Sequence, residues 1–106
     1  MRSVDLDPAA VNEIRDAAAW YSERRPGLDH AFLDEVEACL AYLTERPGSY
    51  PALAEPAALT VRRALLPGFP FAVVFLQRAE KDRVIAVAHV KRQPGYWLHR
   101  LREVSE

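Results

Sequence analysis

The sequence contains a single cysteine, Cys39, so no disulfide can form within the chain. Cys39 lies in an apolar helical pattern, which favours a buried structural residue over a nucleophile. No apolar run approaches the roughly 18 residues that a membrane-spanning helix requires. The first residues also lack the continuous apolar segment of a signal peptide. We therefore expect a reducing compartment, namely the cytoplasm, and no membrane partner.

A strong net charge is missing as well. The formal net charge is -1, which gives no bulk basic field of the kind that favours nucleic-acid binding. The two halves differ, however, because residues 1–50 carry a formal charge of -5 and residues 51–106 carry +4. This asymmetry indicates either an anionic partner for the basic half or two solvated surfaces that attract each other.

The sequence also lacks several common catalytic and ligand-binding motifs. The sequence has no glycine-rich phosphate loop, no His/Cys spacing for a metal and no Ser-His-Asp signature, so it predicts neither a cofactor nor a metal site. Its 106 residues are 50% hydrophobic. That is enough apolar material for one core, and we expect a single domain over residues 1–106.

What the sequence does contain is a run of three predicted strands, at residues 60–66, 71–77 and 83–91. They are rich in Val, Ile and Phe, which suit a pleated, half-buried surface. The links at residues 67–70 and 80–82 are short, which favours antiparallel neighbours. Both faces of the second strand are apolar, so we expect it to be central and covered on both sides.

The third strand is expected to present two apolar faces of unequal size. Strict alternation places its side chains in two groups: Ile85, Val87 and His89 on one face, and Val84, Ala86, Ala88 and Val90 on the other. One face would pack on helices, and the other would be covered by the C-terminal segment or by a partner.

Two helices are predicted before these strands. Residues 3–6 alternate as a short edge strand, and Asp7-Pro8 marks a helix start, with Asp7 as the cap and Pro8 at the first helical position. The helix ends at Pro26-Gly27. Its apolar face is assigned to Val11, Ile14, Ala18 and Tyr21, whereas Asn12, Glu13, Arg15, Asp16 and Glu23 fall mostly elsewhere.

The second helix begins near Leu28-Asp29 and ends at Pro47-Gly48, and the short link predicts an antiparallel hairpin. After the strands, residues 96–101 suggest one or two helical turns. The fold class is therefore α+β, an antiparallel sheet with an N-terminal helical hairpin on one face and a short C-terminal helix (β-α-α-β-β-β-α). The apolar stripe of the second helix comprises Phe32, Val36, Cys39 or Leu40, and Leu43.

One cluster of basic and aromatic residues is a candidate binding or catalytic site. Arginines can clamp phosphates and rings can stack on bases. In RNA cleavage by the 2′-hydroxyl, His89 or Tyr96 would transfer protons and Arg63 or Arg92 would stabilise charge. Alternatively, His89 is a hydrogen-bonded structural residue and Trp97 belongs to the core or an interface. The cluster comprises Arg62, Arg63, His89, Lys91, Arg92, Tyr96, Trp97 and Arg100.

The chain resembles the RelE/ParE toxin superfamily over almost its full length. The resemblance rests on the order of the elements and on residues 62–75 (RRALLPGFPFAVVF) and 84–97 (VIAVAHVKRQPGYW). It implies a toxin held inactive by a cognate antitoxin. ParE-like members poison DNA gyrase without a recognised catalytic set, whereas RelE-like members cut mRNA in the ribosome. By position, the RelE-like residues would be Arg63, Arg92 and Tyr96, with His89 as a further candidate.

This chain departs from the strongly basic RelE pattern, which favours the ParE-like branch. We therefore expect DNA gyrase as the target, with the ribosome and mRNA as the alternative. A non-toxic protein-binding domain is a further alternative. The residues expected to contact a partner are Arg62, Lys91, Trp97 and Arg100.

Overall fold

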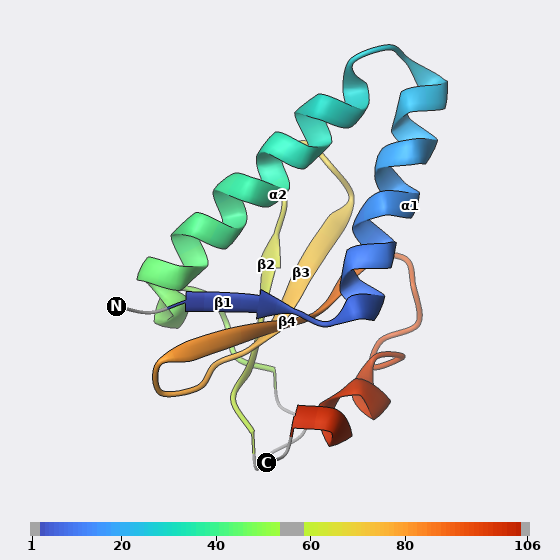
Figure 1. The fold of residues 1–106 in the computed structure, drawn as a ribbon. Coiled ribbons are helices and arrows are strands. Elements are labelled where there is room, and N and C mark those ends of the chain that lie inside the picture. Colours follow the sequence, from blue (N-terminus) through green and yellow to red (C-terminus); the bar gives the residue numbers. More distant parts are fainter. Residues whose placement is uncertain (1–2, 54–58, 105–106) are drawn as a thin grey trace.

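The computed structural model describes residues 3–53 and 59–104. The chain forms a four-stranded sheet in the order β1-β4-β3-β2, with two helices between the first and second strands (Figure 1). The elements are β1 (Ser3–Leu6), α1 (Pro8–Arg24), α2 (Leu28–Glu45), the 3-10 helix η1 (Pro47–Ser49), β2 (Val61–Leu65), β3 (Phe71–Leu76), β4 (Lys81–His89) and the 3-10 helix η2 (Leu98–Val104).

The sheet is mixed. β2, β3 and β4 pair antiparallel, as the short links predict. β1, by contrast, pairs parallel with β4, in the register Ser3↔Lys81 to Leu6↔Val84. The helical hairpin makes the connection between β1 and the meander long, and a long crossover is what a parallel pair requires. The α+β class with an N-terminal helical hairpin is confirmed, while the sheet is not antiparallel throughout.

α1 begins where the sequence predicts. Asp7 caps it, because its Oδ1 accepts a hydrogen bond from the backbone N–H of Ala9 at 2.8 Å, and Pro8 occupies the first turn. The buried residues are Ala10, Ala17 and Tyr21, so the apolar face is turned slightly away from the predicted Val11, which is half-buried. Gly27, at φ 88°, takes the left-handed conformation that lets the chain reverse into α2.

The helices pack on one face of the sheet and form what we call the helix-side core. Phe32, Val36, Cys39 and Leu43 of α2 are buried there, as predicted. Phe32 contacts the rings of Tyr21, Phe69 and Phe71 at centroid distances of 5.3–5.4 Å. From the sheet, this core receives Ala64, Val73, Phe75, Val84 and Val87, together with Leu66, which directly follows β2.

The opposite face carries a smaller cluster, the C-terminal-side core. In Figure 1 the C-terminal segment lies on the other side of the sheet from the helical hairpin. Trp97 and Leu101, each 6% exposed, supply its cover. β3 is central and buried on both faces, as predicted. The members of this core are Val61, Val74, Leu76, Ile85, Ala86, Trp97 and Leu101.

The strict alternation predicted for β4 is wrong. Val74 pairs with Ala86 but Phe75 pairs with Val84, so Ile85 is an extra residue. Such a bulge places two consecutive side chains on one face, and both Ile85 and Ala86 join the C-terminal-side core. Val84 and Val87 then share the helix side. The strand also ends at His89, two residues before the predicted boundary at Lys91.

Candidate functional site

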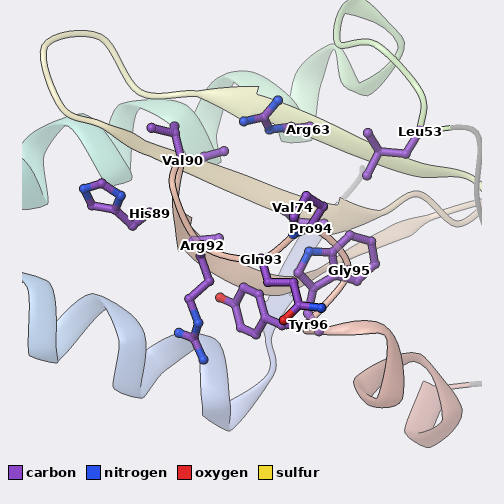
Figure 2. Close-up of a pocket in the computed structure, with 13 residues that line it drawn as sticks. Leu53, Arg63, Val74, His89, Val90, Arg92, Gln93, Pro94, Gly95 and Tyr96 are labelled. Carbon is purple, nitrogen blue, oxygen red and sulfur yellow. The ribbon is translucent and has the colours of Figure 1, made fainter.

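The C-terminal-side face is only partly covered, and the uncovered part holds a pocket of about 330 Å³ (Figure 2). Its floor is made by small side chains of β3 and β4, and the turn after β4 forms one wall. The residues that the sequence singled out and that border it are Arg63, His89, Arg92, Tyr96 and Trp97. The other lining residues are Leu53, Ala72, Val74, Ala88, Val90, Gln93, Pro94 and Gly95.

Two arginines flank this pocket. Arg63 extends from β2, and among the described residues no hydrogen bond or ion pair engages its side chain. Arg92 follows the end of β4, and its guanidinium lies over the Tyr96 ring at 3.8 Å from the centroid. Figure 2 shows Arg63 at one side of the pocket and Arg92 reaching toward α1 at the other. The pocket is therefore apolar at its floor and cationic at its edges.

Exposed apolar side chains adjoin the pocket. Leu65 lies on β2, on the same face as Arg63, and its side chain is 62% exposed. Val90, which lines the pocket, is 43% exposed. We call Arg63, Leu65, Val90, Arg92 and the pocket between them the open face. Exposed apolar side chains beside arginines are the composition expected of a protein-binding surface.

His89 borders the pocket but turns its ring away from it. The imidazole packs against Phe71 at 5.2 Å between ring centroids, and its Nδ1 accepts a hydrogen bond from the backbone N–H of Lys91 at 3.1 Å. With Ala17, Trp20 and Tyr21 it lines a separate hollow beside α1. Figure 2 likewise shows its ring pointing away from Arg63.

Three of the residues expected to contact a partner are used inside the protein. Arg62 donates hydrogen bonds to the carbonyl oxygen of Tyr50 and to Oε1 of Gln77, each at 2.7 Å. Trp97 is buried in the C-terminal-side core. Arg100 pairs with Glu13. Lys91 is exposed.

Glu13 is a site residue that the sequence does not predict, because its position in α1 marks it only as polar. Its Oε1 accepts hydrogen bonds from the backbone N–H of Val87 at 2.9 Å and from Arg100 at 3.1 Å. Its Oε2 accepts from the Tyr96 hydroxyl at 2.6 Å and from Arg100 at 3.1 Å. One carboxylate therefore joins α1, β4 and the C-terminal segment, and we call Glu13, Tyr96 and Arg100 the carboxylate clamp.

The clamp also supplies hydrogen-bond partners for backbone groups at the edge of β4 that β1 does not reach. β1 pairs with β4 only as far as Val84. Beyond that point Arg100 donates to the carbonyl oxygen of Ile85 at 3.0 Å, and Glu13 accepts from the N–H of Val87. Buried backbone groups need such partners. An ion pair thus takes the place that a longer β1 would occupy.

The chemical state of Tyr96 follows from these contacts. Burial, followed by the hydrogen bond to Glu13 and its negative charge, raises the pKa of Tyr96 to about 12. The phenol is therefore neutral at physiological pH and donates a hydrogen bond to Glu13. Burial also raises the pKa of the Cys39 thiol to about 11, with Glu35 adding to the effect. Cys39 is 8% exposed, so the prediction of a buried structural cysteine is confirmed.

Two further observations concern the residues that the structure describes. No group of three or more His, Cys, Asp or Glu side chains among them is arranged to hold a metal ion. Within the same residues, each helix is too short or too polar to cross a membrane.

Comparison with known proteins identifies the fold. No protein-family model and no curated protein matches the sequence. Among solved structures, the chain is similar to one described as the chromosomal ParDE TA system from P. aeruginosa, with a TM-score of 0.71 and 14% sequence identity. The match covers 84% of this chain and 96% of the other. The chain therefore has the fold of that structure, which agrees with the fold expected from the resemblance.

Proposed function

We propose that the protein is the toxin of a type II toxin–antitoxin module, that it is neutralised by a cognate antitoxin, and that it arrests growth in the cytoplasm by binding DNA gyrase. The observation that carries the proposal is the fold shared with the ParDE structure. The open face supports it, because exposed Leu65 and Val90 are suited to burial by another polypeptide.

The antitoxin segment that fits this face has a definite chemistry. An aliphatic side chain would fill the pocket over Ala72 and Ala88. Carboxylates of the same segment would pair with Arg63 and Arg92, which stand at the pocket edges. Complementary charge of this kind raises the association rate and fixes orientation. We therefore propose that the antitoxin contributes an acidic, aliphatic segment.

Gyrase binding is favoured over RNA cleavage by the state of the candidate proton-transfer groups. Cleavage by the 2′-hydroxyl requires a base near the reacting atoms. The His89 ring faces a different hollow, beside α1. The Tyr96 hydroxyl donates to Glu13, and its pKa of about 12 disfavours a phenolate at neutral pH. Neither group is held ready to take a proton beside Arg63.

The second candidate function, a ribosome-dependent mRNA endoribonuclease, is favoured by one observation. Arg63, His89, Arg92 and Tyr96 all border the same pocket. In that function the arginines would stabilise the phosphate, and Tyr96 or His89 would transfer protons.

The proposal is tested with purified protein in a DNA gyrase supercoiling assay, and by expression from a tightly controlled promoter in a bacterial host. We expect growth arrest and inhibition of supercoiling. A variant carrying Arg63→Ala, His89→Ala, Arg92→Ala and Tyr96→Phe removes the nuclease groups. Its circular dichroism spectrum is compared with that of the unchanged protein to establish that it is folded.

Each result separates the alternatives. Inhibition of gyrase by the unchanged protein, together with intact cellular transcripts, supports the gyrase proposal. Transcript cleavage that disappears in the folded quadruple variant supports the nuclease and removes the gyrase proposal. A folded protein that leaves growth and gyrase unaffected would indicate a non-toxic protein-binding domain.

A further inference from the structure

Glu13 lies outside the open face but connects to it through a short chain of contacts. Its Oε2 accepts a hydrogen bond from the Tyr96 hydroxyl at 2.6 Å. The Tyr96 ring supports the Arg92 guanidinium at 3.8 Å. Tyr96 and Arg92 both line the pocket. The position of one pocket arginine therefore depends on a carboxylate of α1.

The clamp also fixes the turn that forms the pocket wall. Arg100 meets the two Glu13 oxygens with two nitrogens, each at 3.1 Å. Such bidentate, charge-assisted pairs hold orientation as well as adding energy. The side chains of Arg100 and Glu13 are only 12% and 16% exposed, so solvent screens the pair little. Residues 93–97, which line the pocket, lie between β4 and this anchor.

No other carboxylate replaces Glu13 among the described hydrogen-bond partners of Tyr96 and Arg100. A carboxylate has about four lone-pair sites, and Glu13 receives four hydrogen bonds from Val87, Tyr96 and Arg100. An amide at this position would present a donor where only donors face it. The loss of the charge should therefore loosen the C-terminal segment while leaving the helix-side core intact.

We propose that Glu13 is a positioning residue for the open face, acting through Tyr96 on Arg92 and through Arg100 on the turn at residues 93–97. The inference that this matters for a partner rests on the proposed toxin function. The positioning itself is measured without any partner, so the two can fail separately.

The first measurement is a spectrophotometric tyrosine titration of Glu13→Gln. The sequence has four tyrosines, and the one with a pKa of about 12 is Tyr96. We expect its ionisation to move to lower pH in Glu13→Gln, since the negative charge that opposes the phenolate is removed. The matched control is Glu23→Gln, the same change on an exposed position of α1, which should leave the titration unchanged.

The second measurement uses iodide quenching of tryptophan fluorescence. Trp20→Phe leaves Trp97 as the only tryptophan of the two in the sequence. Trp97 is 6% exposed, so quenching should be weak at first. In Glu13→Gln we expect the quenching constant to rise several-fold as the segment loosens. Tyr96→Phe, which removes only the hydroxyl, should raise quenching in the same direction, whereas Glu23→Gln should not.

The third measurement is growth arrest. A folded Glu13→Gln protein should need a several-fold higher inducer dose than Glu23→Gln for the same arrest. Unchanged titration and quenching in Glu13→Gln would overturn the positioning role. Altered titration and quenching with unchanged growth arrest would reduce Glu13 to a structural residue. If the unchanged protein arrests no growth, the proposed function fails, while the first two measurements still decide the positioning.

Discussion

The two faces of the sheet are covered by different means. The helix-side core is sealed by two long helices and by a group of aromatic rings from Tyr21, Phe32, Phe69 and Phe71. The C-terminal-side core is covered by a short segment, which the carboxylate clamp holds through Tyr96 and Arg100. The remainder of that face is open. We infer that the first face supplies stability and the second supplies a surface whose shape depends on polar contacts.

Phe32→Ala should lower the free energy of unfolding most, because Phe32 lies in the helix-side core. Phe32 is fully buried among aromatic rings. Truncation of such a ring costs about 3–5 kcal/mol in the free energy of unfolding, which chemical denaturation measures. Leu33→Ala on the same helix is the control, because Leu33 is 39% exposed. A loss no greater than that of the control would show that the helix side does not dominate stability.

Leu101→Ala should have the next largest effect, because it removes part of the cover on the second face. The expected cost is about 2–4 kcal/mol, within the range for buried leucines. Iodide quenching of Trp97 should also increase, since the two residues share one cluster. The matched change is Leu98→Ala, at a residue that is 45% exposed. Equal losses from the two variants would contradict the packing described.

Asp7→Ala tests the link between the sheet and the helix side. Asp7 is 3% exposed, caps α1 through Ala9, and lies 3.5 Å from Arg83. Removal of such a cap costs about 1–2 kcal/mol. Thermal unfolding of Asp7→Ala and Asp7→Asn should separate the two roles, because asparagine keeps a capping oxygen but not the charge. Full stability of Asp7→Ala would exclude a capping contribution.

Leu65→Thr should have the smallest effect on stability. The side chain is 62% exposed, and surface substitutions of this kind change the free energy of unfolding by less than about 0.5 kcal/mol. Its expected effect is instead on growth arrest or on its relief by the antitoxin. A clear loss of stability measured by denaturation would mean that Leu65 belongs to the core.

Alkaline pH should also weaken the second face through Tyr96. The pKa of Tyr96 in the folded protein is about 12, above the ordinary value of 10.0. A tyrosine with a raised pKa contributes its stability fully below the unfolded pKa and loses it as the pH rises through the folded pKa. Stability should therefore fall between about pH 10 and 12, and less so in Tyr96→Phe. An equal fall in that variant would contradict this assignment.

Much of the fold could be predicted because local periodicity carries it. The capping pair Asp7-Pro8, the stripe of α2 and the alternation in β3 all reflect neighbours along the chain. The bulge at Ile85 could not be predicted, because an inserted residue leaves composition and strand propensity unchanged. The role of Glu13 could not be predicted either. Its partners Val87, Tyr96 and Arg100 lie 74 to 87 residues away, and helical spacing marks it only as polar.

The extra residue in β4 has a consequence for the last third of the chain. If Ile85 were accommodated without the bulge, strict alternation after Val84 would invert every later position of the strand with respect to the two sides of the sheet. His89 would then be directed into the pocket, and Ala88 toward the helices. The bulge at Ile85 therefore decides which side of the sheet each later residue of β4 faces.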